Sequence, residues 1–291
     1  MRSDFVQQQN VVCDFSTSDS WVVLSPIEQS IKKKIEAVGT PLKDWDINIY
    51  RGVLTGCNEA FIIDTAKRDE ILANCLSDEE RAKTAELIRP ILRGRDIKRY
   101  GYVDNGLFLI NTHNGIKGKL PRIDINDYPA VKAHLDQYWD KISIRADKGD
   151  TPYNLRNCAY LDDFNKPKII FQEIVQSSQF MYDETIHFMC NDTGRIIVGS
   201  HLPFVLGILN SKLFFYAVKK FYGGGVLGEH GIRMKHTFFG NFPCLPYSKQ
   251  IEDAAKELSK NKGTVDQTDV LIFSAYALSK EEISIIEEDI M

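Results

Sequence analysis

The sequence predicts an α+β fold, in which a mixed sheet is flanked by helices and followed by a short C-terminal helical tail. Segments with helical periodicity alternate irregularly with short apolar and β-branched runs. The 291 residues are 43% hydrophobic and 26% charged, an ordinary balance for a globular protein. Without internal repeats or a low-complexity linker, we expect one mixed domain over residues 1–250. Residues 251–291 should form an acidic helical tail that packs on this domain or on a further one.

Three serines mark predicted helix starts. The segment 25–39 is predicted to be a helix, with Ser25 as its N-cap. Its apolar side chains recur at helical spacing. Ser77 and Ser279 are each followed three residues later by glutamate, which is the spacing of a capping box. We expect Pro90 to end the helix that Ser77 begins, because the residue before a proline disfavours helical geometry. The helix that begins at Ser279 is expected to be the second of two short tail helices.

The remaining patterns predict strands and longer helices. Residues 47–64 should form two extended pieces around a Thr55-Gly56 loop, and residues 127–142 a helix capped by Asp127. The run KPKIIFQEIV is typical of a strand, and TIHFMCNDTGRIIVG of a hairpin with a polar turn. LPFVLGILNSKLFFYAVKKFY predicts one mostly buried helix.

Charge is distributed unevenly along the chain. The formal net charge is −4, yet residues 81–122 hold ten Lys/Arg against three Asp/Glu, a balance of +7. Residues 251–291 hold four Lys against ten Asp/Glu, a balance of −6. The acidic total therefore leaves room for a surface that binds anions.

Motifs of several enzyme classes are incomplete. Gly223, Gly225 and Gly228 have the spacing of a dinucleotide-binding loop, but a helix precedes them where that loop needs a strand. Asp163 and Glu173 flank a predicted strand as in metal-dependent nucleases, without the expected lysine. His187 and Cys190 would supply two zinc ligands where three or four are needed. We therefore predict neither a catalytic residue nor a metal site.

Composition also bounds the cellular context. The six cysteines form no C-x-x-C pair, so we expect buried thiols rather than a zinc knuckle or a disulfide framework. No run of eighteen apolar residues occurs, and the first residues lack a secretory pattern. We expect a cytoplasmic protein without a membrane partner.

The segment LIRPILRGRDIKRYGY is the densest cationic stretch. Arg93 and Arg95 flank Gly94 just after the predicted helix end, so their guanidinium groups should project from a loop. Solvated salt bridges would explain such a stretch without any function. Arginine, however, can pair bidentately with a phosphate or with guanine, which favours nucleic acid as a partner.

Six blocks follow one another in the chain: WDINIYRGVLTGCNEAFIID, IRPILRGRDIKRY, YPAVKAHLDQYWDKISIRADKGDTPYNLR, KPKIIFQEI, LGILNSKLFFY and TDVLIFSAYALSKEEISIIEE. Their order and spacing resemble the C-terminal specificity domain of TaqI-like adenine-specific DNA methyltransferases, and especially the fused type IIG restriction-modification enzymes. The resemblance extends from about Trp21 onward. It departs from the family at Ala277, where a glycine is usual.

This resemblance implies a target recognition domain that binds duplex DNA opposite a separate methyltransferase catalytic domain. That catalytic domain would hold S-adenosylmethionine and an Asn-Pro-Pro-Tyr-type motif. This chain contains no Asn-Pro-Pro, so we expect no cofactor and no enzymatic activity in the chain itself. The tail would pack on the recognition domain or on the catalytic domain.

Phosphate contacts would hold the DNA, and loop side chains between the shared blocks would read the bases. For base reading we favour residues 112–122, 176–185 or 223–235. The residues expected on DNA are Arg93, Arg95, Lys98, Arg99, Arg145, Lys148 and Tyr153, with Arg51, Thr55, Asn58, Lys117, Lys119, Arg233 and Lys235 as further candidates. Two alternatives stay open: a protein-interaction module that uses the acidic tail, and an enzyme that closes the glycine-rich loop over a phosphate.

Overall fold

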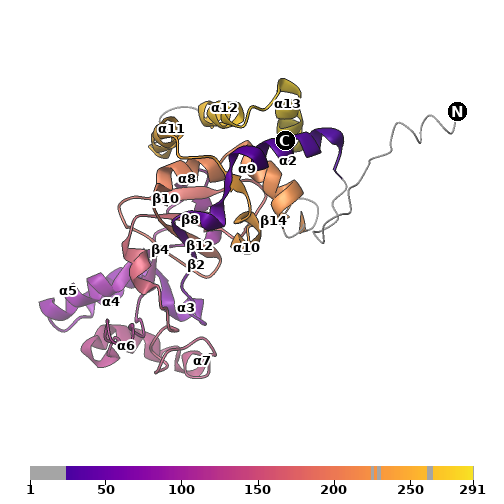
Figure 1. Ribbon diagram of the computed structural model, residues 1–291. Helices are drawn as coiled ribbons and strands as arrows, with labels where there is room; N and C mark the ends of the chain where they lie inside the picture. The colour runs from indigo at the N-terminus through magenta and orange to yellow at the C-terminus, as the bar shows by residue number, and fades with distance from the viewer. Residues whose placement is uncertain (1–23, 224–225, 228–230, 261–264, 291) are drawn as a thin grey trace. The chain divides into compact units, whose positions relative to one another are not determined.

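The computed structural model describes residues 24–223, 226–227, 231–260 and 265–290, and Figure 1 traces its elements. It confirms the α+β class. Chain contacts divide the protein into two compact units. Unit 1 comprises Met1–Trp45, Ile174–Ser178 and Pro203–Met291, and unit 2 comprises Asp46–Glu173 and Gln179–Leu202. This division differs from the predicted boundary at residue 250, because the tail shares unit 1 with the first described helix.

Unit 2, all of whose residues are described, is built on two four-stranded sheets. The first is antiparallel throughout and has the order β10-β8-β12-β2. The second has the order β11-β4-β7-β3 and is mixed, because β11 runs parallel to β4. The strands of unit 2 are β2 (Ile47–Arg51), β3 (Ile62–Asp64), β4 (Ile88–Leu92), β5 (Ile97–Lys98), β6 (Gly101–Tyr102), β7 (Leu107–Ile110), β8 (Lys168–Gln172), β10 (Phe180–Asp183), β11 (Met189–Cys190) and β12 (Gly194–Gly199).

The helices of unit 2 gather at one end of that unit, where α4 packs against α5 and α6 (Figure 1). They and the short 3-10 turns cover a core of strand and helix side chains, including Ile91, Leu109, Val131 and Ile196. The helical elements of unit 2 are α3 (Asn58–Phe61), α4 (Thr65–Ala73), α5 (Asp78–Leu87), η2 (Gly94–Asp96), η3 (Ile125–Asp127), α6 (Pro129–Asp136), α7 (Trp139–Ile142) and η4 (Leu161–Asn165).

A buried ion pair lies within the unit 2 core. The Lys168 ammonium donates to Asp183 Oδ2 at 2.7 Å and to the Phe164 carbonyl at 3.1 Å. The Asp183 carboxylate also accepts the backbone N–H groups of His187 and Phe188. Burial lowers the pKa of Lys168, although the charge of Asp183 opposes that shift. Both charged groups have their hydrogen-bond partners inside the protein. We therefore assign Lys168 to the stability of the fold rather than to ligand binding.

Unit 1 is mainly helical, with small sheets in which β1 pairs with β15 and β14 pairs with β13 and β9. Helix α13 packs against α9 and α2. The elements of unit 1 are α2 (Pro26–Val38), β1 (Thr40–Pro41), η1 (Leu42–Asp44), β9 (Ile174–Val175), α8 (Leu202–Leu209), α9 (Lys212–Ala217), η5 (Val218–Tyr222), β13 (Val226–Leu227), β14 (Gly231–Arg233), α10 (His236–Phe239), β15 (Pro243–Cys244), α11 (Lys249–Ser259), α12 (Val265–Ala275) and α13 (Lys280–Ile290).

The acidic tail is held by lysines of its own unit. The carboxylates of its last helix, α13, pair with four lysines among the described residues: Lys34 with Glu282 at 2.7 Å, Lys212 with Glu287 at 2.6 Å, and Lys219 and Lys220 with Asp289 at 2.7 and 3.1 Å. The predicted packing of the tail on the rest of this chain is therefore present within unit 1.

The predicted helix start at Ser25 is confirmed, and the structure adds a capping box with Glu28 there; the predicted capping box at Ser279 is also confirmed. At Ser77 the hydroxyl accepts the Glu80 N–H at 3.1 Å, as expected. The Glu80 carboxylate, however, accepts the N–H groups of Leu76 and Ala130 instead of closing the box. The start of α5 is thus tied to the start of α6.

Several predicted elements are wrong in extent. Helix α5 ends at Leu87, and Pro90 lies inside strand β4, in keeping with the extended geometry that proline imposes on its predecessor. Residues 127–142 form α6 and α7 instead of one helix, and Tyr128 rather than Asp127 is the N-cap of α6. The predicted strand over residues 166–175 divides into β8 and β9.

The hairpin over residues 185–199 is also wrong. A turn does form, with the Gly194 N–H donating to the Asn191 carbonyl at 2.9 Å. Its two strands nevertheless enter different sheets, since β11 pairs with β4 and β12 pairs with β8 and β2. The predicted helix 202–222 is broken after α8, where the Ser211 hydroxyl accepts the Phe214 N–H and starts α9.

Two further predictions concern membranes and thiols. Among the described residues, no single helix has the length and hydropathy of a membrane span; α8 with the helix that follows it passes that test only as a pair bent by 62°. Cys75, Cys190 and Cys244 are buried free thiols, as predicted, whereas Cys57 and Cys158 are half-buried. Cys13 lies outside the described residues.

Candidate nucleic-acid interface

Two loops of unit 2 form the site: loop A, residues 111–124, and loop B, residues 143–159. Buried polar side chains join them. Asn154 Nδ2 donates to the Ile123 carbonyl at 2.9 Å, and Thr112 Oγ1 donates to the Tyr153 carbonyl at 2.7 Å. The Leu155 N–H also donates to the Thr112 carbonyl at 2.9 Å. Satisfied internal hydrogen bonds of this kind hold two irregular segments in one arrangement.

Arg145 fixes the shape of loop B. Its guanidinium donates to the carbonyls of Thr55, Asp147, Pro152 and Asn154, and it lies 4.5 Å from the centre of the Phe61 ring. Burial lowers its pKa to about 10, which leaves it charged at neutral pH. The prediction that Arg145 contacts DNA is wrong for this structure, because only 6% of the residue is exposed.

Loop A carries a short hairpin. The backbones of Ile116 and Leu120 pair, with N–H···O distances of 2.8 and 2.9 Å. Gly118 has a φ of +76°, the left-handed geometry that a tight turn requires at this position. Lys117 and Lys119 flank it and are exposed. The sequence thus places two cations at the tip of a turn that its glycine makes possible.

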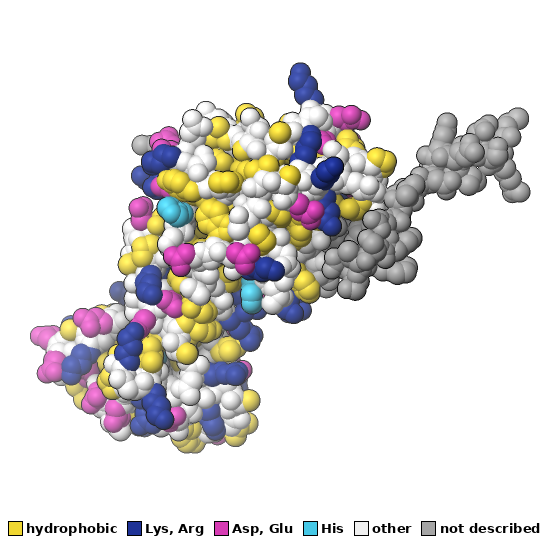
Figure 2. All heavy atoms as spheres, viewed as in Figure 1, with side chains coloured by type: hydrophobic (Ala, Val, Ile, Leu, Met, Phe, Trp, Pro, Cys, Tyr) yellow, Lys and Arg dark blue, Asp and Glu magenta, His cyan; other side chains and the backbone are white. Residues whose placement is uncertain are grey.

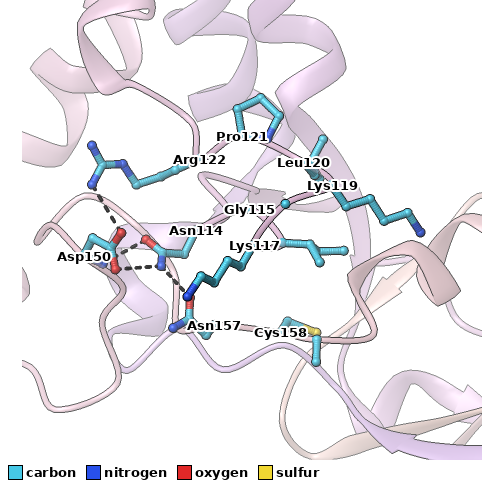
Figure 3. A pocket seen from close by; sticks show the side chains of 13 residues that line it. Asn114, Gly115, Lys117, Lys119, Leu120, Pro121, Arg122, Asp150, Asn157 and Cys158 are labelled. Carbon is cyan, nitrogen blue, oxygen red and sulfur yellow. Dashed lines mark hydrogen bonds and ion pairs between the residues drawn. The ribbon is translucent and has the colours of Figure 1, made fainter.

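The hairpin borders a hollow of about 860 Å³ between loops A and B, which Figure 3 shows from close by. Asn114 lines it and hydrogen bonds with both Asp150 and Asn157. Arg122 contacts Asp150, with 3.5 Å between Nη1 and Oδ2. Lys119 turns away and pairs with Asp162. Lys117 extends along the hollow (Figure 3) and has no carboxylate partner within unit 2.

The arginine segment 93–99 separates into structural and exposed cations. Arg93 Nε and Nη2 donate to the buried Asp96 carboxylate, both at 2.9 Å. Burial raises the pKa of Asp96, but the hydrogen bonds and charge of Arg93 outweigh it and leave that pKa below its usual value. Arg95 is exposed, and Lys98 Nζ donates to its carbonyl at 2.8 Å. Arg99 lies over the Tyr100 ring. The segment follows strand β4 rather than a helix.

The other predicted residues of unit 2 have local partners. Lys148 Nζ donates to the Ser143 carbonyl at 2.6 Å, and the Tyr153 hydroxyl donates to Asp136 at 2.6 Å. Thr55 is buried and its hydroxyl donates to Asn58, so this pair shapes the backbone that Arg145 binds. Arg51 lies 3.9 Å from Asp192 and stays largely exposed.

Two predicted residues belong to unit 1. Arg233 is exposed on β14, and Lys235 lies over the Phe238 ring. Gly225 and Gly228 of the glycine-rich loop lie outside the described residues. The structure therefore assembles Lys117 and Lys119 around one hollow, and leaves Arg233 and Lys235 in a separate unit.

The predictions missed Asp150 and Asn157, and included Asn114 only as a member of the stretch 112–122. One signal was available in the sequence, since Gly149 precedes Asp150 in loop B. A Cβ at Gly149 would lie 2.4 Å from Asn114 Oδ1, so only glycine lets this side chain reach loop B without a shift.

Charged groups elsewhere are of mixed sign and include the two carboxylates of the incomplete nuclease motif. On the face seen in Figure 2, Lys/Arg and Asp/Glu side chains are interspersed. Among the described residues no group of three or more His, Cys, Asp or Glu is placed to hold a metal ion. Glu173 pairs with Arg195 at 2.5 Å and Asp163 with Lys166 at 2.6 Å, so both carboxylates of the incomplete nuclease motif have cationic partners.

Comparison with known proteins finds a matching family model and structures of similar fold. Residues 89–227 match the family model of the TaqI-like C-terminal specificity domain. The fold is similar to a structure of the type IIL restriction-modification enzyme MmeI in complex with DNA, with a TM-score of 0.61 and 14% identity over 86% of this chain. It is also similar to the type IIG restriction endonuclease BpuSI, with a TM-score of 0.57 and 15% identity over 91% of this chain. The matches span 36% and 32% of those chains, respectively.

Proposed function

We propose that this chain, which carries a TaqI-like C-terminal specificity domain, recognises a duplex DNA sequence and directs a separate catalytic domain to it. The observation that carries the proposal is the extent of the family match. Residues 89–227 include the arginine segment 93–99 and both loops of the site. A specificity domain with exposed cations on these loops is suited to hold phosphates and to present side chains to a groove.

The catalytic partner in this proposal is an adenine-specific DNA methyltransferase domain. This chain covers about a third of the restriction-modification enzymes that it resembles. The rest of such a protein would hold S-adenosylmethionine and, in a fused enzyme, a nuclease. We also propose that the protein is cytoplasmic, because restriction-modification enzymes act on DNA inside the cell.

A protein-interaction role for the acidic tail has less support. Four lysines of unit 1 already pair with Glu282, Glu287 and Asp289. These carboxylates are therefore engaged within the chain and are not free to bind a basic partner.

The test is an anisotropy titration of the chain with duplex DNA of mixed sequence, repeated at low and moderate salt. We expect binding that weakens as salt rises, and a log–log slope that falls by about 1 in Arg95→Ala. Lys141→Ala is the matched control, because it removes one exposed positive charge that is paired with Glu59 at 2.8 Å. Absence of binding at low salt, or binding that salt does not change, would refute the proposal.

A further inference from the structure

The orientation of the Asn157 amide follows from one backbone hydrogen bond. The Asp150 N–H donates at 2.8 Å to the Asn114 side chain, and a backbone N–H can only donate. The accepting atom is therefore Asn114 Oδ1, and its other branch is the Nδ2 donor. This Nδ2 contacts Asp150 Oδ1 at 3.0 Å and also Asn157. The near atom of Asn157 must be its Oδ1, so its own Nδ2 faces away from Asn114 (Figure 3).

The hollow consequently offers hydrogen-bond donors. Asn157 presents two N–H groups, and the exposed Lys117 ammonium presents three. The one carboxylate in the lining, Asp150, already accepts from Asn114 and lies 3.5 Å from Arg122. An incoming ligand therefore meets donors from two different loops and an acceptor that is engaged.

The donors of Asn157 and Lys117 match the major-groove edge of guanine better than that of the other bases. An asparagine with a free amide selects adenine, because it offers one donor and one acceptor to adenine N6 and N7. Asn157 Oδ1 is turned toward Asn114 and accepts from it, so the branch that faces away from Asn114 is the Nδ2 donor. Guanine presents two acceptors, N7 and O6, in the major groove.

We propose that Asn157 and Lys117 read the major-groove edge of a guanine in the target site, with Asn114 as the positioning residue. This inference rests on the proposed function of the chain. Phosphate oxygens would also accept from these donors. The two contacts differ in their consequence, because a contact to guanine selects a base at one position and a contact to phosphate selects none.

Asn157→Asp tests the proposal with little change of shape. Its Oδ1 still accepts from Asn114, whereas an oxygen replaces the outward Nδ2. Sites selected from a random duplex pool by the wild-type chain should share a guanine at one position. Asn157→Asp should lower that preference by roughly tenfold and favour cytosine, which offers an N4 donor to a carboxylate.

Lys117→Ala and Asn114→Ala complete the set. We expect Lys117→Ala to weaken the preference at the same position, and Asn114→Ala to broaden it because the Asn157 amide is then free to turn. The other selected positions should keep their bases, which a general loss of folding would not allow. Lys141→Ala is again the control for lost charge and should leave all positions unchanged.

Two results would overturn the inference while leaving the proposed function intact. One is an unchanged base at every position in Asn157→Asp, and the other is a uniform loss of affinity with a flatter salt slope, the mark of a phosphate contact. If the wild-type chain binds no DNA or selects no sequence, the proposed function itself fails. Circular dichroism and thermal unfolding of each variant identify the folded ones.

Discussion

Three lysines that face the acidic tail in unit 1 and three exposed lysines of unit 2 differ in their partners. In unit 1, Lys34, Lys212 and Lys219 each lie within 2.7 Å of a tail carboxylate. In unit 2, Lys117 has no such partner, and Lys98 and Lys148 donate to backbone carbonyls at 2.8 and 2.6 Å. A carbonyl leaves the positive charge of a lysine uncompensated, whereas a carboxylate cancels it. A count of lysines along the sequence therefore overstates the positive surface near the tail in unit 1, whereas Lys117, Lys98 and Lys148 keep the charge that the count gives them.

The largest expected effect is that of Arg145→Ala. It removes the donor that four backbone carbonyls share, and unsatisfied buried carbonyls cost about 1–3 kcal/mol each before the loop relaxes. We expect the free energy of unfolding to fall by about 3 kcal/mol or more, measured by urea denaturation. Arg145→Lys keeps the charge but cannot make four such bonds, and it should lose most of the same stability. Unchanged stability with weakened DNA binding would restore Arg145 as a surface cation.

Arg93→Ala should have the next largest effect. It leaves the buried Asp96 carboxylate with the Arg93 N–H and Asn105 as donors, at a cost of about 1–2 kcal/mol. Because the folded pKa of Asp96 is lowered, the pair stabilises the protein above the unfolded pKa near 3.9, and this contribution is lost as pH falls through the folded value. Urea denaturation from neutral pH to pH 3 should therefore find a smaller acid-dependent loss in the variant. An equal acid-dependent loss of unfolding free energy in the wild-type protein and the variant would argue that the Arg93–Asp96 pair does not stabilise the fold.

Asp289→Asn should have the smallest effect on stability. It breaks the pairs with Lys219 and Lys220, whose side chains are about one third exposed, at a cost of about 0.5–1 kcal/mol. Lys220 keeps Glu28 at 3.3 Å, so the released Lys219 should steepen the salt dependence of non-specific DNA binding, by about 1 if it reaches a phosphate. Glu257→Gln is the control, because it removes an exposed carboxylate of α11 that forms no ion pair among the described residues. If the salt slope of the variant equals that of the wild-type chain, pairing with a carboxylate does not decide whether a lysine is available to DNA.

Local signals in the sequence predicted the local structure. The Ser25 and Ser279 caps are confirmed because donor and acceptor lie within one helical turn. Predictions failed where the partner is distant in the chain. The turn after Asn191 forms, but β11 finds its partner in β4, about a hundred residues earlier. No property of the residues around the turn could reveal that pairing.

The same limit applies to the site. Residues 112–122 were predicted as one of three stretches that read bases, and this stretch lines the hollow. Its partners Asp150 and Asn157 belong to another loop, so their role depends on tertiary contacts. Arg145 and Arg95 look alike in sequence, yet one is buried among carbonyls and the other is exposed. Burial separates a cation that shapes the fold from a cation that is available to a ligand.

The hairpin at Ile116–Leu120 closes on its own backbone hydrogen bonds, with Gly118 at its tip and no atom within 4 Å of a Cβ built there. Backbone atoms make these hydrogen bonds, so exchange of the Lys117 and Lys119 side chains would leave them in place. Under the proposed function, a library that varies only these two positions would be a compact starting point for altering which sequences the chain selects.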